Sequence, residues 1–311
     1  MEKTALLFAG QGAQYVGMGR DLAAQFPQAN AWFERSRKTL EFDLPALCFN
    51  GPEAELTRTQ NAQPAIFVTS WAAFQLLKEQ APKLEYQATA GLSLGELTAL
   101  AAAGVFSFED GLNIARQRGR FMQEACEATT GTMAAVLGID AEVLRGICAE
   151  ADVEMANLNC PGQIVISGEA ANIGKACELA IAKGARRAVP LPVAGAYHSR
   201  LMAGAQAKVH KMLALSAIQS PAVAVISNVT ALPHGGPDEI RRRLVEQVIS
   251  PVRWEDSIRY LLAQGFRRFI ELGPGTTLCG FLKRIDKTAQ ALNVADVPSL
   301  QTTLQALATN P

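Results

Sequence analysis

The sequence predicts an α/β fold in which helices cover a mostly parallel sheet and a small ferredoxin-like unit is inserted. Strand-like apolar runs alternate with helix-like periodicity from the N-terminus onward. From about residue 132 the units shorten to the order β-α-β-β-α-β, and after Pro192 the longer rhythm returns. We therefore expect residues 1–130 and 196–311 to form a large domain and residues 131–195 to form the inserted one.

The expected elements follow from apolar periodicity and from the glycine and proline turns that separate them. Before the insert these are a strand at 4–9, a tight glycine turn at 10–12, helices from 18 to 26 and from 64 to 79, a strand at 86–90, and helices at 96–103 and 108–127. The insert has strands at 133–138, 153–158, 163–167 and 186–190 and helices at 141–150 and 170–183. After it come helices at 199–213, 238–249 and 278–285, strands at 222–227 and 268–272, and from residue 293 an edge strand and a terminal helix.

Length and composition limit the class of protein. A chain of 311 residues, 49% of them hydrophobic, can bury a large core. Because 29 basic residues balance 29 acidic ones, we expect neither nucleic acid nor an anionic membrane as a partner. The apolar run at the N-terminus is too short for a signal peptide, and no apolar stretch reaches the roughly 20 residues of a membrane helix. These features favour a cytoplasmic enzyme with a small substrate.

The cysteines and histidines do not predict a metal site. Six cysteines are scattered without a C-x-x-C pair, and the three histidines are not at metal-ligand spacing from them. We therefore expect reduced, mostly buried thiols. The alanine-rich helices carry mixed charge and no evident oligomerisation seam, which favours a monomer.

The segment Gly91-Leu92-Ser93-Leu94-Gly95 lies between a strand-like and a helix-like run, which is the layout of a nucleophile elbow. Glycines allow a strand to turn sharply into a helix, so the serine side chain projects and nearby N–H groups can face an oxyanion. Such a pattern also occurs in ordinary loops. In this context it makes Ser93 the candidate nucleophile of an acyl transfer reaction.

A serine nucleophile needs a base, and the chain has three histidines. His210 lies in a charged helical run and His234 in a proline-glycine turn, so we expect both to be solvated surface residues. His198 lies where the insert returns to the large domain and is therefore the favoured base. No Asp or Glu can be named as a third member, which favours a Ser-His dyad oriented by a backbone carbonyl or by an amide such as that of Gln247.

Six segments together are characteristic of one enzyme family. They are FAGQGAQ at 8–14, GLSLGE at 91–96, RGRFMQ at 118–123, NCPGQIVISG at 159–168, YHS at 197–199 and ELGPG at 271–275. Through them the chain resembles, over nearly its whole length, the malonyl-CoA:acyl carrier protein transacylases of type II fatty acid and trans-acyltransferase polyketide systems. The resemblance implies an α/β-hydrolase-like large domain with a ferredoxin-like insert.

The resemblance also implies a mechanism. Ser93 is the acylated nucleophile, His198 is the base, and the backbone N–H groups of Gln11 and Leu94 form the oxyanion hole. Malonyl passes from malonyl-CoA to the phosphopantetheine thiol of an acyl carrier protein by ping-pong kinetics. No cofactor is implied beyond the coenzyme A thioester substrate and the phosphopantetheine arm of the partner.

Substrate selection is implied in the same way. Arg118 matches the arginine that binds the malonyl carboxylate, and a guanidinium suits a carboxylate bidentately. Tyr197, with Leu94, resembles the pattern that favours malonyl over methylmalonyl, because an aromatic ring crowds an α-methyl branch. Further residues implied to line the site are Gln63, Asn159 and Gln247.

One position departs from the family pattern. Leu92 stands where the family usually has a histidine, and we expect leucine there to alter nucleophile positioning or the pH profile. Two alternatives remain open at this point. One is an editing acyl-carrier-protein hydrolase, which Arg118 disfavours, and the other is a noncatalytic carrier-docking module. The sequence does not distinguish fatty acid from polyketide synthesis, nor does it identify the carrier.

Overall fold

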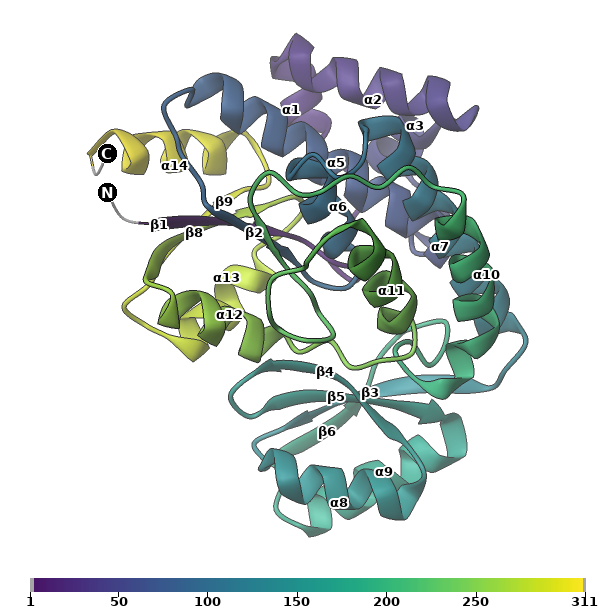
Figure 1. Cartoon of the computed structure of the whole chain (residues 1–311). Coiled ribbons are helices and arrows are strands. Elements are labelled where there is room, and N and C mark those ends of the chain that lie inside the picture. Colours follow the sequence, from purple (N-terminus) through teal and green to yellow (C-terminus); the bar gives the residue numbers. More distant parts are fainter. Residues whose placement is uncertain (1–2, 310–311) are drawn as a thin grey trace.

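The computed structural model describes residues 3–309 and contains two sheets that lie one above the other in Figure 1. All neighbouring strands of the larger sheet are parallel. In spatial order they are β7 (Ala224–Ile226), β2 (Ala88–Gly91), β1 (Lys3–Phe8), β8 (Phe266–Leu272) and β9 (Gln290–Val294). This parallel sheet confirms the predicted α/β class.

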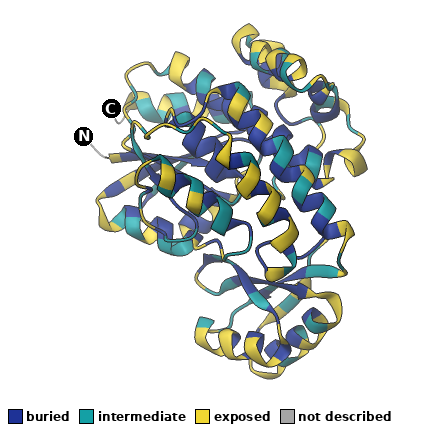
Figure 2. Cartoon of the chain, turned by 45° about the vertical axis from the view of Figure 1, so that its right-hand side comes forward, coloured by how far each residue is buried: buried dark blue, intermediate teal, exposed yellow. Residues whose placement is uncertain are grey.

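Helices bury both faces of the parallel sheet at its three central strands β2, β1 and β8, which are mostly dark blue in Figure 2. Side chains alternate along β1, so Leu6 and Phe8 join one apolar cluster while Ala5 and Leu7 join another. The first cluster includes buried residues of α1 (Arg20–Gln25), α2 (Pro27–Leu40), α3 (Leu44–Asn50), α4 (Glu53–Leu56), α5 (Thr59–Gln80), α6 (Gly95–Ala102), α7 (Phe108–Glu127), α10 (Ala203–Ala214), α11 (Pro237–Gln247) and α14 (Val297–Thr309). The second includes residues of α12 (Trp254–Ala263) and α13 (Thr277–Ile285).

The smaller sheet is antiparallel and has the strand order β4-β5-β3-β6. Its elements are β3 (Gly131–Leu137), α8 (Ala141–Ala151), β4 (Glu154–Cys160), β5 (Gln163–Glu169), α9 (Ala170–Ala182) and β6 (Arg187–Pro190). Their order along the chain is the expected β-α-β-β-α-β. An apolar cluster of its own lies between this sheet and the two helices. The division at residues 131 and 195 stays a prediction.

Backbone hydrogen bonds join the two parts where β4 approaches the segment before α12. Leu158 N donates to Val252 O at 2.9 Å, and Val252 N donates to Ala156 O at 2.8 Å. Helices α12 and α13 also contact β4. The antiparallel part is therefore held against the segment before α12 and against α12 and α13.

The element boundaries differ from expectation where tertiary contacts decide them. Helix α5 was expected to begin at Pro64 but begins at Thr59, whose N–H donates to the Gln123 side chain of α7 at 3.0 Å. The short 3-10 turn Arg200–Met202 precedes α10, where one helix was expected. Helices α2, α3, α4 and α12 were not predicted.

The expectation for the cysteines is confirmed, because all six are unpaired and five are buried. Among the described residues no group of three or more His, Cys, Asp or Glu side chains is placed to hold a metal ion. None of the helices between residues 3 and 309 combines the length and apolar character needed to cross a membrane.

Candidate active site

Ser93 occupies a sharp turn between β2 and α6. Its φ angle of +51° is in the left-handed region, which a non-glycine residue rarely adopts. The flanking glycines are required by close packing: a Cβ on Gly91 would lie 1.9 Å from Gly95 C, and a Cβ on Gly95 would lie 2.2 Å from Phe8 O. The turn therefore packs too closely against β1 and the start of α6 for any side chain at positions 91 and 95, which explains the G-x-S-x-G spacing.

His198 faces the Ser93 hydroxyl. The distance from Ser93 Oγ to His198 Nε2 is 2.8 Å, and His198 Nδ1 lies 2.9 Å from the backbone oxygen of Gln247. A carbonyl oxygen can only accept, so Nδ1 carries the proton and Nε2 is left to accept the serine proton. Burial and the nearby Arg118 charge lower the pKa of His198 to about 4, which keeps the imidazole neutral near pH 7. The orienting group is therefore a backbone carbonyl.

Arg118 on α7 is buried, and its guanidinium reaches the same serine. Nη2 donates to Ser93 Oγ at 3.2 Å and to Gln247 Oε1 at 2.9 Å, while Nη1 donates to Gln63 Oε1 at 2.8 Å. Burial lowers the pKa of Arg118 to about 10, so the group stays charged near pH 7. These three acceptors, on Gln63, Ser93 and Gln247, are neutral groups. No carboxylate among residues 3–309 forms a hydrogen bond with the buried Arg118 guanidinium.

The neighbouring arginines of α7 have different surroundings. Arg116 is half-buried and donates to Gln60 O at 3.2 Å and to Asn61 Oδ1 at 2.8 Å. Arg120 is exposed and lies 3.7 Å from a carboxylate oxygen of Glu124. Helical periodicity turns Arg118 alone of these three toward Ser93.

A second set of polar side chains adjoins Arg118. Gln63 Nε2 donates to Gln11 Oε1 at 3.3 Å, and Gln11 Nε2 donates to the Tyr197 hydroxyl at 3.2 Å. The Tyr197 hydroxyl also forms a short hydrogen bond with Thr59 Oγ1. Gln63 and Tyr197 are buried, so this chain of contacts fixes the side chain of Gln11 beside the cavity.

A cavity of about 860 Å³ opens above Ser93 and lies between the two sheets. Of the predicted site residues, Gln11, Ser93, Asn159, Tyr197 and His198 line it. The buried Oδ1 of Asn159 has no hydrogen-bond partner within the described part of the chain. The remaining four predicted residues adjoin the lining: Gln63 and Gln247 contact Arg118, and Leu94 follows Ser93 at the start of α6. All the predicted site residues thus come together.

Leu92, the position that departs from the family pattern, also lines the cavity. Its side chain packs against the apolar cluster that contains residues of α12 and α13. Its backbone contributes to the turn, because Leu92 N donates to Phe8 O at 3.1 Å and Leu92 O accepts from Gly95 N at 2.9 Å.

A polar cluster that the sequence did not predict lies behind the turn. Asn228 holds the turn from below: its Oδ1 accepts from Ser93 N at 2.7 Å, and its Nδ2 donates to Gly91 O at 2.8 Å. Glu96, at the end of the GLSLGE motif, is fully buried next to Asn228. A buried carboxylate directly after an elbow was the available signal, since such a group needs donors.

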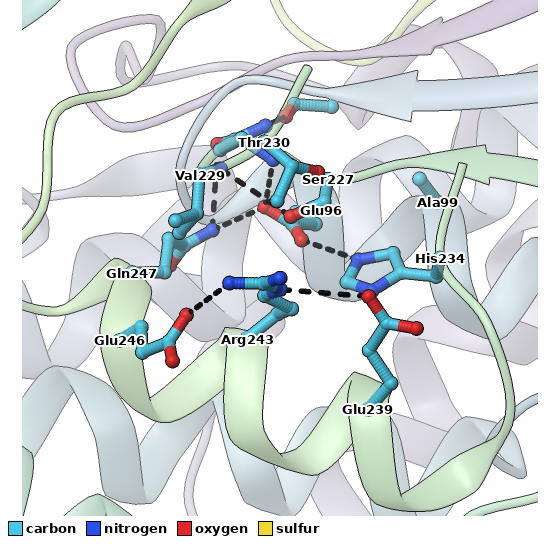
Figure 3. Close-up of polar contacts among 12 residues, drawn as sticks. Glu96, Ala99, Ser227, Val229, Thr230, His234, Glu239, Arg243, Glu246 and Gln247 are labelled. Atoms are coloured by element: carbon cyan, nitrogen blue, oxygen red, sulfur yellow. Dashed lines mark hydrogen bonds and ion pairs between the residues drawn. The ribbon is translucent and has the colours of Figure 1, made fainter. Parts of the chain in front are cut away.

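The expectation that His234 is a solvated surface residue is wrong. Its side chain is buried, and Nε2 lies 2.7 Å from Glu96 Oε1, as Figure 3 shows. The backbone of the turn is held against β7, because His234 N donates to Val225 O at 2.8 Å. Proline-glycine turns are usually exposed, but the buried Glu96 carboxylate needs a hydrogen-bond donor, and the His234 side chain supplies it. His210 is exposed as expected.

Residues 5–309 match the family model of the acyl transferase domain, and the chain therefore belongs to that family. Within it, the chain is 45% identical to the malonyl CoA-acyl carrier protein transacylase of Bacillus subtilis, over 99% of this chain and 98% of that protein. It is 40% identical to the enzyme of that name from Escherichia coli K12, over 94% and 96% of the two chains. The polyketide biosynthesis protein ThaF of Burkholderia thailandensis is 45% identical over 90% of this chain but only 24% of that protein.

Solved structures agree with these relationships. The malonyl CoA-acyl carrier protein transacylase of Coxiella burnetii superposes with a TM-score of 0.95 at 35% identity, covering 98% of both chains. A malonyl-transacylase solved in complex with its type II PKS acyl-carrier protein gives a TM-score of 0.94 at 37% identity, covering 98% of this chain and 99% of that one.

Proposed function

We propose that the protein transfers a malonyl group from malonyl-CoA to the phosphopantetheine thiol of an acyl carrier protein through a malonyl-Ser93 intermediate. One observation carries this proposal: the Ser93 hydroxyl lies 2.8 Å from the Nε2 of a neutral histidine and 3.2 Å from a buried guanidinium nitrogen. A base and a carboxylate-binding cation thus converge on one nucleophile.

In the first half reaction His198 Nε2 takes the Ser93 proton as Oγ attacks the thioester carbonyl. The backbone N–H groups of Gln11 and Leu94 stabilise the resulting oxyanion. When the C–S bond breaks, the proton on His198 passes to the coenzyme A sulfur, and malonyl-Ser93 remains. The Nδ1 hydrogen bond to Gln247 O keeps the imidazole in the required tautomer throughout.

In the second half reaction the pantetheine thiol of the carrier gives its proton to His198 and attacks malonyl-Ser93. The C–O bond to Ser93 breaks, and the proton returns from His198 to Ser93 Oγ. Coenzyme A leaves before the carrier reacts with malonyl-Ser93, and this order gives ping-pong kinetics. The reaction balances with malonyl-CoA and the carrier thiol as reactants and with coenzyme A and the malonyl-carrier thioester as products, and we propose no further cofactor.

Arg118 selects the malonyl group by pairing its fork with the free carboxylate. Gln63 and Gln247 hold the guanidinium from both sides, at 2.8 Å and 2.9 Å. The buried ring of Tyr197 narrows the space beside the α-carbon and favours malonyl over methylmalonyl. Asn159, whose Oδ1 lacks a partner in the part of the chain that the structure describes, offers an acceptor to substrate N–H groups.

The names of the relatives support both substrates, since the Bacillus subtilis and Escherichia coli proteins are malonyl CoA-acyl carrier protein transacylases. The complex of a malonyl-transacylase with its type II PKS acyl-carrier protein supports a carrier protein as the partner. A hydrolase that clears simple acyl chains would leave the Arg118 cation buried without a carboxylate, which is unfavourable.

Steady-state kinetics with malonyl-CoA and phosphopantetheinylated carrier protein tests the proposal. Transfer through malonyl-Ser93 predicts parallel double-reciprocal lines when both substrates are varied, with malonyl-carrier as the product. Free malonate released at the same rate with and without carrier would instead identify a hydrolase. Carrier binding without any release of coenzyme A would identify a docking module.

A further inference from the structure

Four buried polar residues lie behind the nucleophile turn, and we call them the Glu96 cluster: Glu96, Asn228, His234 and Gln247. Figure 3 shows Glu96 between His234 on one side and Gln247 on the other. A carboxylate that is removed from water is costly unless its oxygens accept several hydrogen bonds. The contacts that Glu96 makes therefore indicate what it does.

The two oxygens of Glu96 have different partners. Oε1 accepts from His234 Nε2 at 2.7 Å, while Oε2 accepts from Gln247 Nε2 at 2.6 Å and from Asn228 N at 3.0 Å. His234 Nδ1 is buried and has no partner among the described residues, so the ring proton belongs on Nε2, where it meets the carboxylate. His234 thus fixes one oxygen of Glu96 and leaves the other for Gln247.

This arrangement determines which way the Gln247 amide points. Nε2 faces three oxygens: Ser93 O at 3.0 Å, Glu96 Oε2 at 2.6 Å and Asn228 Oδ1 at 3.3 Å. A flipped amide would place its oxygen against these three oxygens and its NH₂ group against the guanidinium of Arg118. Consequently Gln247 Oε1 faces Arg118 Nη2, at 2.9 Å.

The Glu96 carboxylate also affects the pKa of Arg118, although no hydrogen bond joins the two side chains in the described part of the chain. Burial lowers the pKa of Arg118, and the nearby Glu96 carboxylate opposes that shift. Because Gln247 lies between them, the carboxylate supports the charged guanidinium and yet does not occupy its fork. A carboxylate on the substrate can therefore pair with the guanidinium by taking the place of its 3.2 Å contact with Ser93 Oγ.

We propose that Glu96, anchored by His234, is a positioning residue for the substrate-carboxylate site: it orients the Gln247 amide, and that amide orients Arg118. The inference rests on the proposed function, since it explains how the malonyl carboxylate is selected. It assigns a role to a buried pair whose side chains contact neither the Ser93 hydroxyl nor His198 and that does not line the cavity.

Two variants and one control test this. Glu96→Gln replaces a group that only accepts by an amide whose NH₂ end must face a donor, and His234→Phe keeps an aromatic ring but removes the N–H that holds Glu96. Thr98→Val is the matched control, because Thr98 is buried on the same helix α6 and its hydroxyl has no partner within residues 3–309. For each protein, single-turnover loading of Ser93 from malonyl-CoA and from acetyl-CoA is measured by quenched intact mass and divided by the folded fraction.

The readout is the ratio of malonyl to acetyl loading, which a loss of stability alone does not change. We expect this ratio to fall about 10-fold in Glu96→Gln and about 3-fold in His234→Phe, with acetyl loading within about 3-fold of wild type, because a misplaced guanidinium affects only the substrate that carries a carboxylate. Thr98→Val should keep the wild-type ratio. If Glu96→Gln does not fold, His234→Phe decides the result.

Equal slowing with both substrates, or no change in the ratio, would overturn the inference and leave the proposed function intact. A wild-type protein that loads acetyl but not malonyl would overturn the proposed function, and the inference with it. The two failures are therefore distinguishable in one experiment.

Discussion

The two sheets that enclose the cavity contribute different chemistry. The side built on the parallel sheet supplies Ser93 and, from α7, Arg118, both held by several hydrogen bonds in buried surroundings. The strands of the antiparallel sheet contribute Met133, Ala135, Asn157, Asn159, Gln163 and Val165 to the lining, and among these described residues only Asn159 has a buried amide oxygen without a hydrogen-bond partner. We therefore propose that the residues of the parallel side perform the reaction and that those of the antiparallel side shape the space for the acyl-thioester.

His198 belongs to the connection between the two sides. It follows β6 of the antiparallel sheet, and its backbone has φ +57°, yet its side chain is fixed by Gln247 O at the end of α11. The base is thus held by the parallel side although the chain reaches it from the antiparallel one.

The largest effect is expected on the parallel side. Ser93→Ala removes the nucleophile, and we expect malonyl transfer to fall by about 10⁴-fold or more, as for other enzymes that use a serine nucleophile. Mass spectrometry should detect no acyl-enzyme, while circular dichroism should show an unchanged fold. An acyl adduct that persists in this variant would place the nucleophile elsewhere.

Arg118→Ala sharpens the comparison by separating substrate binding from catalysis. We expect malonyl loading to fall by about 100-fold and acetyl loading by much less, because acetyl has no carboxylate to pair with the guanidinium. Loading rates from the two coenzyme A thioesters measure this. An equal loss with both thioesters would show that Arg118 supports Ser93 rather than the substrate.

The pH dependence tests the burial of the base. Because the pKa of His198 lies at about 4, kcat/KM with acetyl-CoA should stay level as pH falls from 8 to 5 and decline near pH 4. Removing the Arg118 charge should raise this pKa, so Arg118→Ala should decline at a higher pH. An acid limb near pH 6.5 in the wild type would contradict a buried, cation-adjacent base.

The lowered pKa of His198 also makes the stability of the fold depend on pH. Between pH 6.5 and 4 the unfolded chain binds a proton at His198 that the folded chain does not bind. The free energy of unfolding should therefore decrease as pH falls through this range, and His198→Gln should lose that part of the dependence. Urea titrations at several pH values measure this.

The smallest effect is expected on the antiparallel side. Asn159→Ala removes one unpartnered acceptor from the wall, so we expect KM for malonyl-CoA to rise by about 3- to 10-fold with kcat nearly unchanged. Initial-rate kinetics separates the two constants. A fall in kcat comparable to that in Arg118→Ala would mean that the antiparallel side takes part in the chemistry.

Much of the site was predictable because local sequence encodes it. The elbow needs glycine at 91 and 95 for steric reasons and so leaves a pattern in the sequence. Arg118 was predicted through the family resemblance alone, because the local sequence of α7 does not distinguish it from Arg116 and Arg120. Strands of the parallel sheet are buried on both faces and appear as apolar runs, which is why β1 and β8 were found within two residues of their ends.

The Glu96 cluster was not predictable in the same way. Asn228 and His234 lie more than 130 positions from Glu96 and meet it only because β7 pairs with β2. Nothing near His234 marks it as buried, since proline and glycine flank it as in an exposed turn. Helix α2 was missed for a related reason: its buried residues, among them Phe33, are few and separated by exposed polar ones.

Intact-mass measurement of the wild-type protein after incubation with malonyl-CoA, followed by addition of phosphopantetheinylated carrier protein, tests the central claim most directly. We predict a malonyl adduct that peptide mapping places on Ser93 and that moves to the carrier when the carrier is added. The absence of an adduct, an adduct on another residue, or an adduct that is lost to water at the same rate with and without carrier would contradict it.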